Sequence, residues 1–329
     1  MMGLMTDVAA PDLERTLEQH RVELTGYCYR MLGSSFEADD AVQETLVRAW
    51  RSYDSFEGRS ALRSWLYRIA TNVCLDMLKS RQRRALPMDM VSASSGDDEA
   101  GPRLPESKWI QPMPDGRALP PTDDPVEVAE SRETIRVAFI AALQHLPPRQ
   151  RAVLILREVL RWKAAEVAEL LGTSVASVNS ALQRARATLA ATDLTDTDPR
   201  RPDDEEQREL LARYLDAFER FDIESLVSLL HEDATMSMPP YELWLHGAGE
   251  LRKWLLGAGS GCRGSAFAPV EANGAPACAQ WRRSETGEGY EPWAIHVLRL
   301  SDGRISGIDF FVDPDLFPLF GLSSQPPSR

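Results

Sequence analysis

The sequence predicts two all-α domains followed by an α+β domain. Apolar residues recur at intervals of three and four along residues 13–79 and again along 126–190, which is the period of an amphipathic helix. After residue 205, two helical segments are followed by short strand-like runs separated by Gly, Pro and Asp, which we expect to form a curved antiparallel sheet. With 329 residues the chain is also too long for one typical domain core.

Changes in pattern divide the chain into four segments. We expect a helical bundle over 10–86, an acidic, proline-rich linker over 87–128, a second helical domain over 129–191 and the α+β domain over 205–325. Proline cannot continue a helix, so the linker should separate the helical parts. Trp109 in the linker is costly to expose, so its segment should dock on a folded surface, with plain loop packing as the alternative.

The net charge of −13 hides two basic regions. Residues 59–84 carry seven Lys or Arg against one Asp, and residues 131–191 carry nine against four acidic residues. Residues 192–329 are acidic, with 13 basic and 24 acidic groups. Two basic regions in an acidic protein suit two separate contacts with phosphate groups, although a solvated helix face is the plain alternative for either one.

The sequence shows no sign of a membrane protein, a secreted protein or a metal-binding protein. No apolar run approaches the roughly 18 to 20 residues that cross a bilayer, and the first residues lack the basic start of a signal peptide. We therefore expect a soluble cytoplasmic protein with no membrane partner, no metal and no cofactor. The cysteines form no C-x-x-C or C-x-x-H pair and should be buried small hydrophobes. They are Cys28, Cys74, Cys262 and Cys278.

Residues 164–189 have helix-turn-helix spacing. A short amphipathic helix over 164–171 is followed by a turn, Gly172-Thr173-Ser174, and a second helix over 175–189. Small polar and basic residues on the second helix suit a DNA major groove, whereas a plain helical hairpin is the alternative. The candidate DNA-contacting residues are Ser174, Ser177, Asn179, Ser180, Gln183, Arg184 and Arg186.

Two groups of motifs resemble a known family. Residues 39–50, DDAVQETLVRAW, and 56–76, FEGRSALRSWLYRIATNVCLD, resemble region 2 of extracytoplasmic-function (ECF) sigma factors. Residues 145–154, HLPPRQRAVL, and the helix-turn-helix that follows resemble region 4 of the same family. Residues 205–329 are similar to the SnoaL-like domains, cones of the nuclear-transport-factor-2 (NTF2) type, that are fused to one subgroup of these factors. The resemblance implies a sigma region 2 bundle, a sigma region 4 helix-turn-helix and a SnoaL-like cone.

The same resemblance implies an alternative sigma factor, which binds core RNA polymerase and directs it to promoter DNA. In the family, a polar helix face in region 2 docks on the polymerase clamp, and a merely solvated face is the alternative here. The matching residues at helical spacing are Asp39, Asp40, Gln43, Glu44 and Arg48.

A sigma factor that melts a promoter must hold an unstacked base, which requires a stacking group and a hydrogen-bonding group. Phe56 and Asn72 are the candidates for this pocket, and Trp65 is expected in the core. Asp76 is expected either to accept from a cytosine amine or to be a plain surface acid. The strand's phosphates would be held by Arg59, Arg63 and Arg68.

The second helix of the helix-turn-helix departs from the commonest family pattern. Asn179 precedes Ser180, Ala181 follows it, and Gln183 replaces a usual His. We therefore expect this helix to bind DNA phosphates more weakly than the commonest family pattern does. The side chains of Asn179 and Gln183 are suited to hydrogen-bond adenine, and Arg184 or Arg186 to contact guanine or phosphate.

The role of the α+β domain has several candidate explanations. SnoaL-like folds include cyclases and isomerases that use an acid–base pair in their cavity, so a fused isomerase, cyclase or ligand-sensing enzyme is the alternative function. We predict instead no catalysis by the chain and a domain that modulates the sigma factor, either by intramolecular control or by binding a small ligand. A separate inhibitor protein is a further candidate partner. The candidate pocket residues are Tyr241, His246, His296 and Asp309.

Overall fold

The computed structural model describes residues 10–53, 56, 61–79, 82–191, 204–284 and 289–327. The chain forms two compact units. Unit 1 comprises residues 1–82, 116–134 and 142–192, and unit 2 comprises 83–115, 135–141 and 193–329. Residues 87–115 of the predicted linker thus belong to unit 2, and 116–128 to unit 1. The chain passes between the units after residues 82, 115, 134, 141 and 192.

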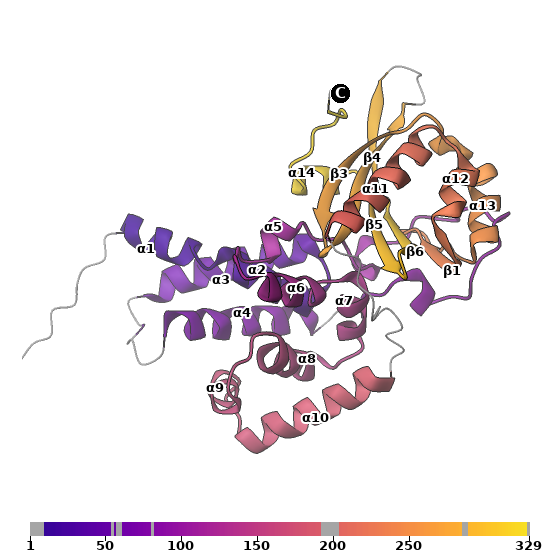
Figure 1. Cartoon of the computed structure of the whole chain (residues 1–329). Helices are drawn as coiled ribbons and strands as arrows, with labels where there is room; N and C mark the ends of the chain where they lie inside the picture. The colour runs from indigo at the N-terminus through magenta and orange to yellow at the C-terminus, as the bar shows by residue number, and fades with distance from the viewer. Residues whose placement is uncertain are drawn as a thin grey trace, which may run out of the picture. The chain divides into compact units, whose positions relative to one another are not determined.

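A helical bundle forms the first part of unit 1 (Figure 1). Gly33 ends one helix with φ of 71°, and the Ser34 side chain caps the next by accepting from the Glu37 amide at 3.2 Å. In the core, the Tyr27 hydroxyl lies 2.7 Å from Thr71 Oγ1. The helices are α1 (Ala10–Glu18), α2 (Arg21–Leu32), α3 (Ser35–Ser52) and α4 (Leu62–Leu78).

The second part of unit 1 contains the helix-turn-helix. Its turn includes Gly172 with φ of 60°, a conformation that favours glycine. Two short helices, α5 (Asp115–Ala118) and α7 (Val137–Gln144), each span a boundary between the units. The remaining helices of unit 1 are α6 (Pro125–Glu133), α8 (Pro148–Leu154), the π-helical turn η4 (Ile155–Val159), α9 (Ala164–Leu170) and α10 (Val175–Ala191).

Arg151 of α8 is buried and donates to several backbone and amide oxygens. It donates to Gln144 Oε1 at 2.6 Å, to the Gln144 carbonyl at 3.2 Å and to the Leu146 carbonyl at 3.1 Å. It also donates to the carbonyl of Met31, at the end of α2. One side chain therefore joins the two parts of unit 1.

Unit 2 is built on a six-stranded sheet with the order β2-β1-β6-β5-β4-β3. The prediction of an antiparallel sheet is wrong at one pair, because β1 and β6 run parallel; the other neighbours are antiparallel. The strands are β1 (Leu230–Ser237), β2 (Trp244–His246), β3 (Ala266–Ala272), β4 (Ala275–Arg283), β5 (Tyr290–Ser301) and β6 (Arg304–Phe311).

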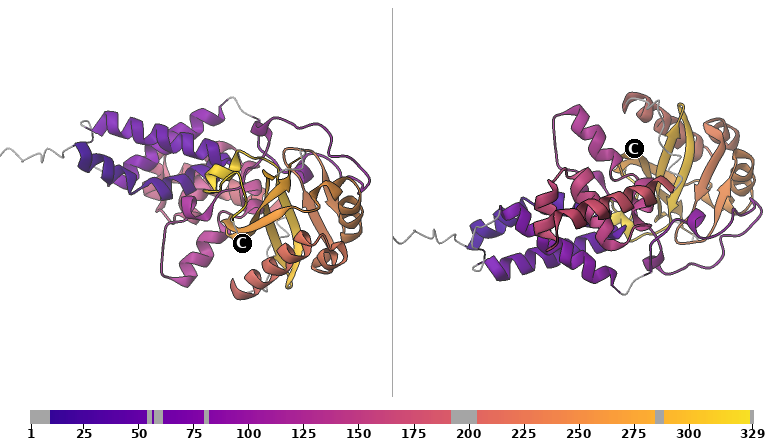
Figure 2. Two further views of the ribbon diagram at one scale, coloured as in Figure 1. Left: turned by 90° about the horizontal axis from the view of Figure 1, so that it is seen from above. Right: turned by 90° about the horizontal axis from the view of Figure 1, so that it is seen from below.

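Helices cover one face of this sheet, as Figures 1 and 2 show. Helix α11 contacts β3 and β4, whereas α13 contacts β1 and β2. Phe218, Leu226 and Trp254 from the three main helices share one apolar core with residues of the strands. The further helical elements of unit 2 are α11 (Asp204–Glu219), α12 (Ile223–Ser228), α13 (Ala248–Leu256), α14 (Leu316–Leu319), and the 3-10 turns η2 (Pro87–Asp89), η3 (Glu106–Lys108) and η5 (Ala258–Cys262).

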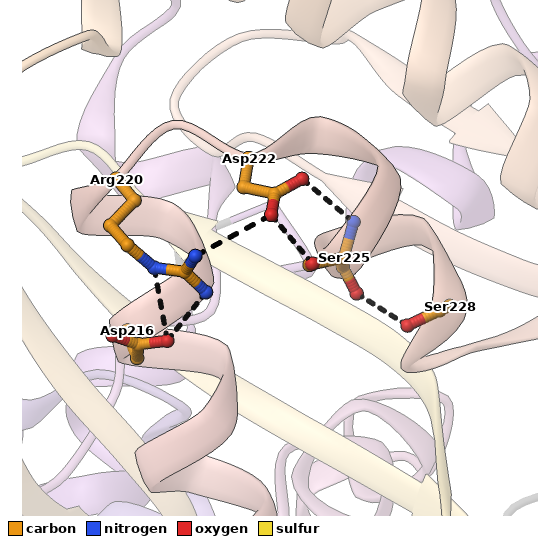
Figure 3. Close-up of polar contacts among 5 residues, drawn as sticks. All are labelled: Asp216, Arg220, Asp222, Ser225 and Ser228. Atoms are coloured by element: carbon orange, nitrogen blue, oxygen red, sulfur yellow. Dashed lines mark hydrogen bonds and ion pairs between the residues drawn. The ribbon is translucent and has the colours of Figure 1, made fainter.

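The turn between α11 and α12 is closed by a polar network (Figure 3). Asp222 caps α12 by accepting from the Ser225 amide at 3.1 Å and from its hydroxyl at 2.7 Å, and these bonds lower the pKa of Asp222. Arg220 donates to Asp216 Oδ2 at 2.7 Å and lies 3.6 Å from Asp222. The network fixes the corner where the chain turns from one covering helix to the next.

The linker segment around Trp109 is docked on unit 2, as predicted. Trp109 is 2% exposed and Met113 is 1% exposed. The backbone amide of Met113 donates to Asn273 Oδ1 at 2.9 Å, and the backbone amide of Asn273 donates to the Met113 carbonyl at 3.0 Å. Asn273 Nδ2 also donates to the Ile135 carbonyl at 2.6 Å. The side chain of Asn273, in the turn between β3 and β4, therefore holds two stretches of chain that are 22 residues apart.

The four cysteines are buried and free, which confirms their prediction as small core residues. None of the described helices is both long and apolar enough to cross a membrane. Within the described ranges, no cluster of three or more His, Cys, Asp or Glu side chains is arranged to hold a metal ion.

Candidate nucleic-acid interface

One face of α4 carries residues predicted to contact an open DNA strand. Trp65, Arg68 and Asn72 follow one another at intervals of three and four, so they share one side of the helix. The half-buried Trp65 ring lies 4.9 Å from the Phe56 ring, which in turn lies 6.1 Å from Tyr53. An aromatic cluster thus stands at one end of this face, and the exposed Asn72 lies two turns further along. The prediction of Trp65 as a core residue is wrong, since its side chain is only partly covered.

Arg63, near the start of α4, contacts an acid and two rings. Its Nε donates to Glu23 Oε2 at 2.7 Å, and its guanidinium carbon lies 5.2 Å from the Tyr67 ring centroid and 5.7 Å from that of Trp162. Burial raises the pKa of Tyr67, so this phenol stays neutral. Arg63 remains 44% exposed and can exchange its carboxylate partner for a phosphate.

The other charged residues on α4 are also in exposed ion pairs. Arg68 Nη2 lies 3.4 Å from Glu169 Oε1 of α9, and Lys79 Nζ donates to Asp76 at 2.7 Å. The bond from Lys79 lowers the pKa of Asp76. Exposed pairs of this kind are weak, so they do not withhold these side chains from DNA. Arg59 lies outside the described residues.

The polar side of α3 forms a second surface. Its opposite side packs into the bundle through Ala38, Val42 and Leu46, which are buried. Trp50 is one of the apolar residues at helical spacing along residues 13–79, but its side chain is 57% exposed, seven residues after Gln43 on the same side of the helix. In the sequence, this exposure was indicated only by the spacing of seven residues, two helical turns, between Gln43 and Trp50. The surface carries the predicted residues Asp39, Asp40, Gln43, Glu44 and Arg48, of which Asp39 is half-buried and the others exposed.

The second helix of the helix-turn-helix, α10, presents a polar exposed side. Its inner side is anchored by Val178, Leu182 and Ala185. The Ser174 hydroxyl begins the helix by accepting from the Ser177 amide at 3.1 Å. Two arginines hold local partners: Arg184 donates to Ser180 Oγ at 2.6 Å, and Arg186 to Glu158 Oε1 at 2.7 Å. All seven predicted residues are exposed, namely Ser174, Ser177, Asn179, Ser180, Gln183, Arg184 and Arg186.

Comparison with known proteins decides the family. Residues 16–84 match Sigma-70 region 2, 136–189 match Sigma-70 region 4, and 211–308 match the SnoaL-like domain. Over 322 residues the chain is 44% identical to the ECF RNA polymerase sigma factor SigG of Mycobacterium tuberculosis, a match that covers 94% of this chain and 84% of SigG. The chain belongs to the ECF RNA polymerase sigma factors.

A second relative supports the fold of the whole sigma factor. The ECF RNA polymerase sigma factor SigJ of Mycobacterium tuberculosis is 29% identical, over 95% of this chain and 96% of SigJ. The crystal structure of SigJ superposes with a TM-score of 0.60 at 23% identity, and covers 95% of this chain and 99% of that one. The resemblance drawn from the motifs at 39–76 and 145–154 is confirmed, as are the two helical domains and the SnoaL-like fold.

In the SnoaL-like domain of this sigma factor, His296 belongs to a buried hydrogen-bonded chain. Its Nδ1 lies 3.0 Å from the Tyr214 hydroxyl and its Nε2 lies 2.8 Å from Gln280 Oε1, while Gln280 Nε2 donates to Ser265 Oγ at 2.9 Å. A neutral imidazole with its proton on Nε2 satisfies both contacts. Burial accordingly lowers the pKa of His296 to about 3.

Aromatic side chains enclose this histidine. The ring centroids of Phe310, Phe267 and Phe218 lie 4.0, 5.6 and 5.9 Å from that of His296. His296 is fully buried, and all three rings belong to the core between the sheet and its helices. The interior around His296 is therefore filled by side chains.

Asp309 lies on the other face of the sheet from His296. His296 pairs with Phe310 across β5 and β6, so Asp309, one residue earlier, points to the opposite side. The buried Asp309 accepts from Ser237 Oγ at 2.6 Å and lies 3.4 Å from Arg299 Nε. An acid–base pair is thus not assembled from His296 and Asp309.

The other two candidate pocket residues occupy different surroundings. His246 is exposed on the short edge strand β2, and Tyr241 lies partly buried against the apolar core of unit 2. The strand pairing places His246 opposite Thr235 of β1.

The buried histidine predicts acid sensitivity of unit 2. The pKa of His296 is lower in the folded state, about 3, than the ordinary value of 6.5, so protons bind the unfolded chain more readily. The contribution of His296 to the free energy of unfolding of unit 2 is fully present above pH 6.5. It falls as the pH drops toward 3, by about 2 kcal/mol at pH 5 relative to neutral pH. In His296→Gln this pH dependence should disappear, even if the baseline stability also falls. Urea series at pH 7.5 and pH 5, followed by pulse-labelling mass spectrometry of β5 peptides, check this; an equal loss in both proteins would contradict it.

Proposed function

We propose that this sigma factor binds core RNA polymerase through the polar side of α3, opens promoter DNA on the face of α4 and reads an upstream duplex element with α10. The observation that carries the proposal is the α4 face, which combines an accessible aromatic cluster with an exposed amide on one side of a helix. The proposal therefore assigns a separate surface to each step of promoter-specific initiation.

The α4 face suits the capture of an unpaired base. Phe56 supplies a ring on which a base can stack, and the side chain of Asn72 can both donate and accept hydrogen bonds to a base edge. Arg63 and Arg68 lie on the same helix, and each would exchange its carboxylate partner for a phosphate of the strand. In this proposal Trp65 backs the Phe56 ring.

The exposed side of α10 suits direct reading of a major groove. Asn179 and Gln183 are one turn apart, and both amides match the two hydrogen-bonding atoms of an adenine edge. Arg184 offers the donors that a guanine edge or a phosphate accepts. Its bond to Ser180 is local and exposed, so it does not oppose such a contact.

The SnoaL-like domain is proposed as a regulatory part of the chain that performs no catalysis. The placement of His296 and Asp309 on opposite sheet faces, and the filled interior around His296, support this proposal over a fused isomerase or cyclase. Its control would act through a preference for one arrangement of the sigma regions over another.

Transcription from a promoter library with purified core RNA polymerase tests the proposal. We expect the full-length chain to select discrete start sites, and a chain truncated after Leu189 to select the same sites with a different yield, because all three proposed surfaces precede residue 190. The difference in yield would give the sign of the regulation. If neither protein bound core polymerase or selected a start site, the proposed function would be wrong and an enzymatic role of the SnoaL-like domain would have to be reconsidered.

A further inference from the structure

A segment of unit 1, residues 116–134, packs against α2 and α3; we call it the strap. Near its start, Arg117 Nη2 lies 2.8 Å from Asp39 Oδ2. At its end, Arg30 of α2 donates to the Thr134 carbonyl at 3.1 Å and to the Thr134 hydroxyl at 2.6 Å. Arg30 is only 5% exposed, so its guanidinium depends on these acceptors.

A glycine in α2 permits the closest contact of the strap. A Cβ atom on Gly26 would lie 2.3 Å from the carbonyl oxygen of Ala118 and 2.9 Å from Arg30 Nη1. The backbone of the strap can therefore reach this helix only where a side chain is missing. Ala118 itself is 1% exposed, so the contact is fully covered.

Between these attachment points the strap is loosely packed. Helix α6 has no buried residue, and Val126 is 64% exposed. A cavity of about 490 Å³ lies beneath the strap, with Glu23 and Arg63 on one side and Glu127 and Glu130 on the other. Segments with few buried apolar contacts open at low free-energy cost.

The attachment at Asp39 bears on the proposed function. Asp39 belongs to the α3 surface assigned above to core RNA polymerase, and in this structure its carboxylate is engaged by Arg117. A carboxylate held by a guanidinium of its own chain presents less charge and less accessible surface to a partner. The strap is therefore placed to compete with polymerase for this surface.

We infer that the strap is an intramolecular competitor that covers the Asp39 edge of the polymerase-binding surface and must leave it when core RNA polymerase binds. The inference rests on the proposed role of α3. The strap is suited to this task because a polar contact fixes its start, a backbone contact over Gly26 positions it and a cavity lies under its middle.

Charge reversal at Arg117 is the direct test. Full-length Arg117→Glu should bind core RNA polymerase about 3- to 10-fold more tightly, because the variant loses the attraction to Asp39 and adds repulsion between like charges. The matched control is Arg103→Glu, which reverses a linker arginine that lies 3.5 Å from Asp313 in unit 2, and should leave the affinity unchanged. Equal or weaker binding of Arg117→Glu would overturn the inference.

A pair of glycine substitutions gives a second, uncharged test. Gly26→Ala should displace the Ala118 carbonyl, speed hydrogen exchange over residues 116–122 and also tighten polymerase binding. Gly116→Ala is the control within the strap, because a Cβ at that position meets nothing within 4 Å. Unchanged exchange and affinity in Gly26→Ala would contradict the inference, and retention of helical exchange protection in α2 and α3 would show that the variant is folded.

Asp39→Ala separates this inference from the proposed function. Weaker polymerase binding of Asp39→Ala would support the role of α3, and Arg117→Glu should then bring no gain in the Asp39→Ala background. If Asp39→Ala weakens binding while Arg117→Glu alone has no effect, the strap inference is wrong and the proposed function stands. If Asp39→Ala binds polymerase as tightly as the unaltered chain, the assignment of Asp39 to the polymerase surface fails, and the strap inference fails with it.

Discussion

Phe56→Ala is expected to reduce transcription from a duplex promoter by about 5- to 150-fold. Stacking of a base on an aromatic side chain contributes about 1–3 kcal/mol, and this range of free energy corresponds to that range of rates. Phe56 lies against Trp65 at the end of the α4 face, where an unpaired base would be held. The measurement is the rate of open-complex formation with saturating holoenzyme, so that changes in polymerase affinity do not enter.

Asn72 offers a matched pair of substitutions for the same step. Asn72→Ala removes both hydrogen-bonding atoms, whereas Asn72→Asp keeps the shape and the acceptors but loses the donor. We expect both variants to open the duplex more slowly, because Asn72 is exposed on the α4 face and its amide is proposed to bond the base edge. A defect in both would indicate that the donated bond matters.

A template with a preformed bubble at the downstream element provides the control. The bases at the downstream element are already unpaired in such a template, so the Phe56 and Asn72 variants should recover most of their activity on it. Wild-type opening rates on duplex DNA in all three variants would show that these residues do not capture a base.

Arg151→Met is expected to destabilise α8 by at least about 3 kcal/mol. The substitution approximately keeps the volume, but it leaves buried acceptors of Gln144, Leu146 and Met31 without their donor, and each unsatisfied buried group costs about 1–3 kcal/mol. Hydrogen exchange of the α8 amides in the full chain measures the loss locally, which suits a protein of more than one unit.

Arg149→Met is the control on the same helix. Arg149 is exposed in the first turn of α8 and its side chain is not the cap, and replacing such a surface residue usually changes stability by less than about 0.5 kcal/mol. Equal exchange in the two variants would mean that Arg151 is not the side chain that joins the two parts of unit 1.

Local patterns predicted much of the fold. The helix-turn-helix was expected over 164–171 and 175–189, and the helices span Ala164–Leu170 and Val175–Ala191. This accuracy follows from helical periodicity, a glycine in the turn and Ser174 as the cap, all of which act within a few residues.

Long-range pairing accounts for what the sequence did not reveal about the fold. The parallel pairing of β1 with β6 joins residues about 70 positions apart, and no local pattern specifies its direction. One local signal did bear on the order of the strands. Strand β3 contains Pro269, which has no backbone N–H to donate and is therefore tolerated mainly in edge strands, and β3 lies at the edge of the sheet.

Candidate sites were predictable by residue type but not by partner. The sequence singled out Arg63 and Arg68 as phosphate contacts, but their acids, Glu23 and Glu169, are 40 and 101 residues away along the chain. The exposure of Trp50 depends on which side of α3 the bundle buries. Such facts arise only when separate helices pack together.

The anchoring of the linker on Asn273 changes what a truncated chain would be. A chain that ends after Leu189 lacks Asn273 and Ala272, so Met113 and Pro114 lose the surface with which they pair. The apolar linker side chains would then meet water, and they would make the shortened protein prone to self-association and to capture by chaperones. Its yield and its activity therefore need to be normalised to the monomeric fraction, since a weak truncated sigma factor could be an aggregated one.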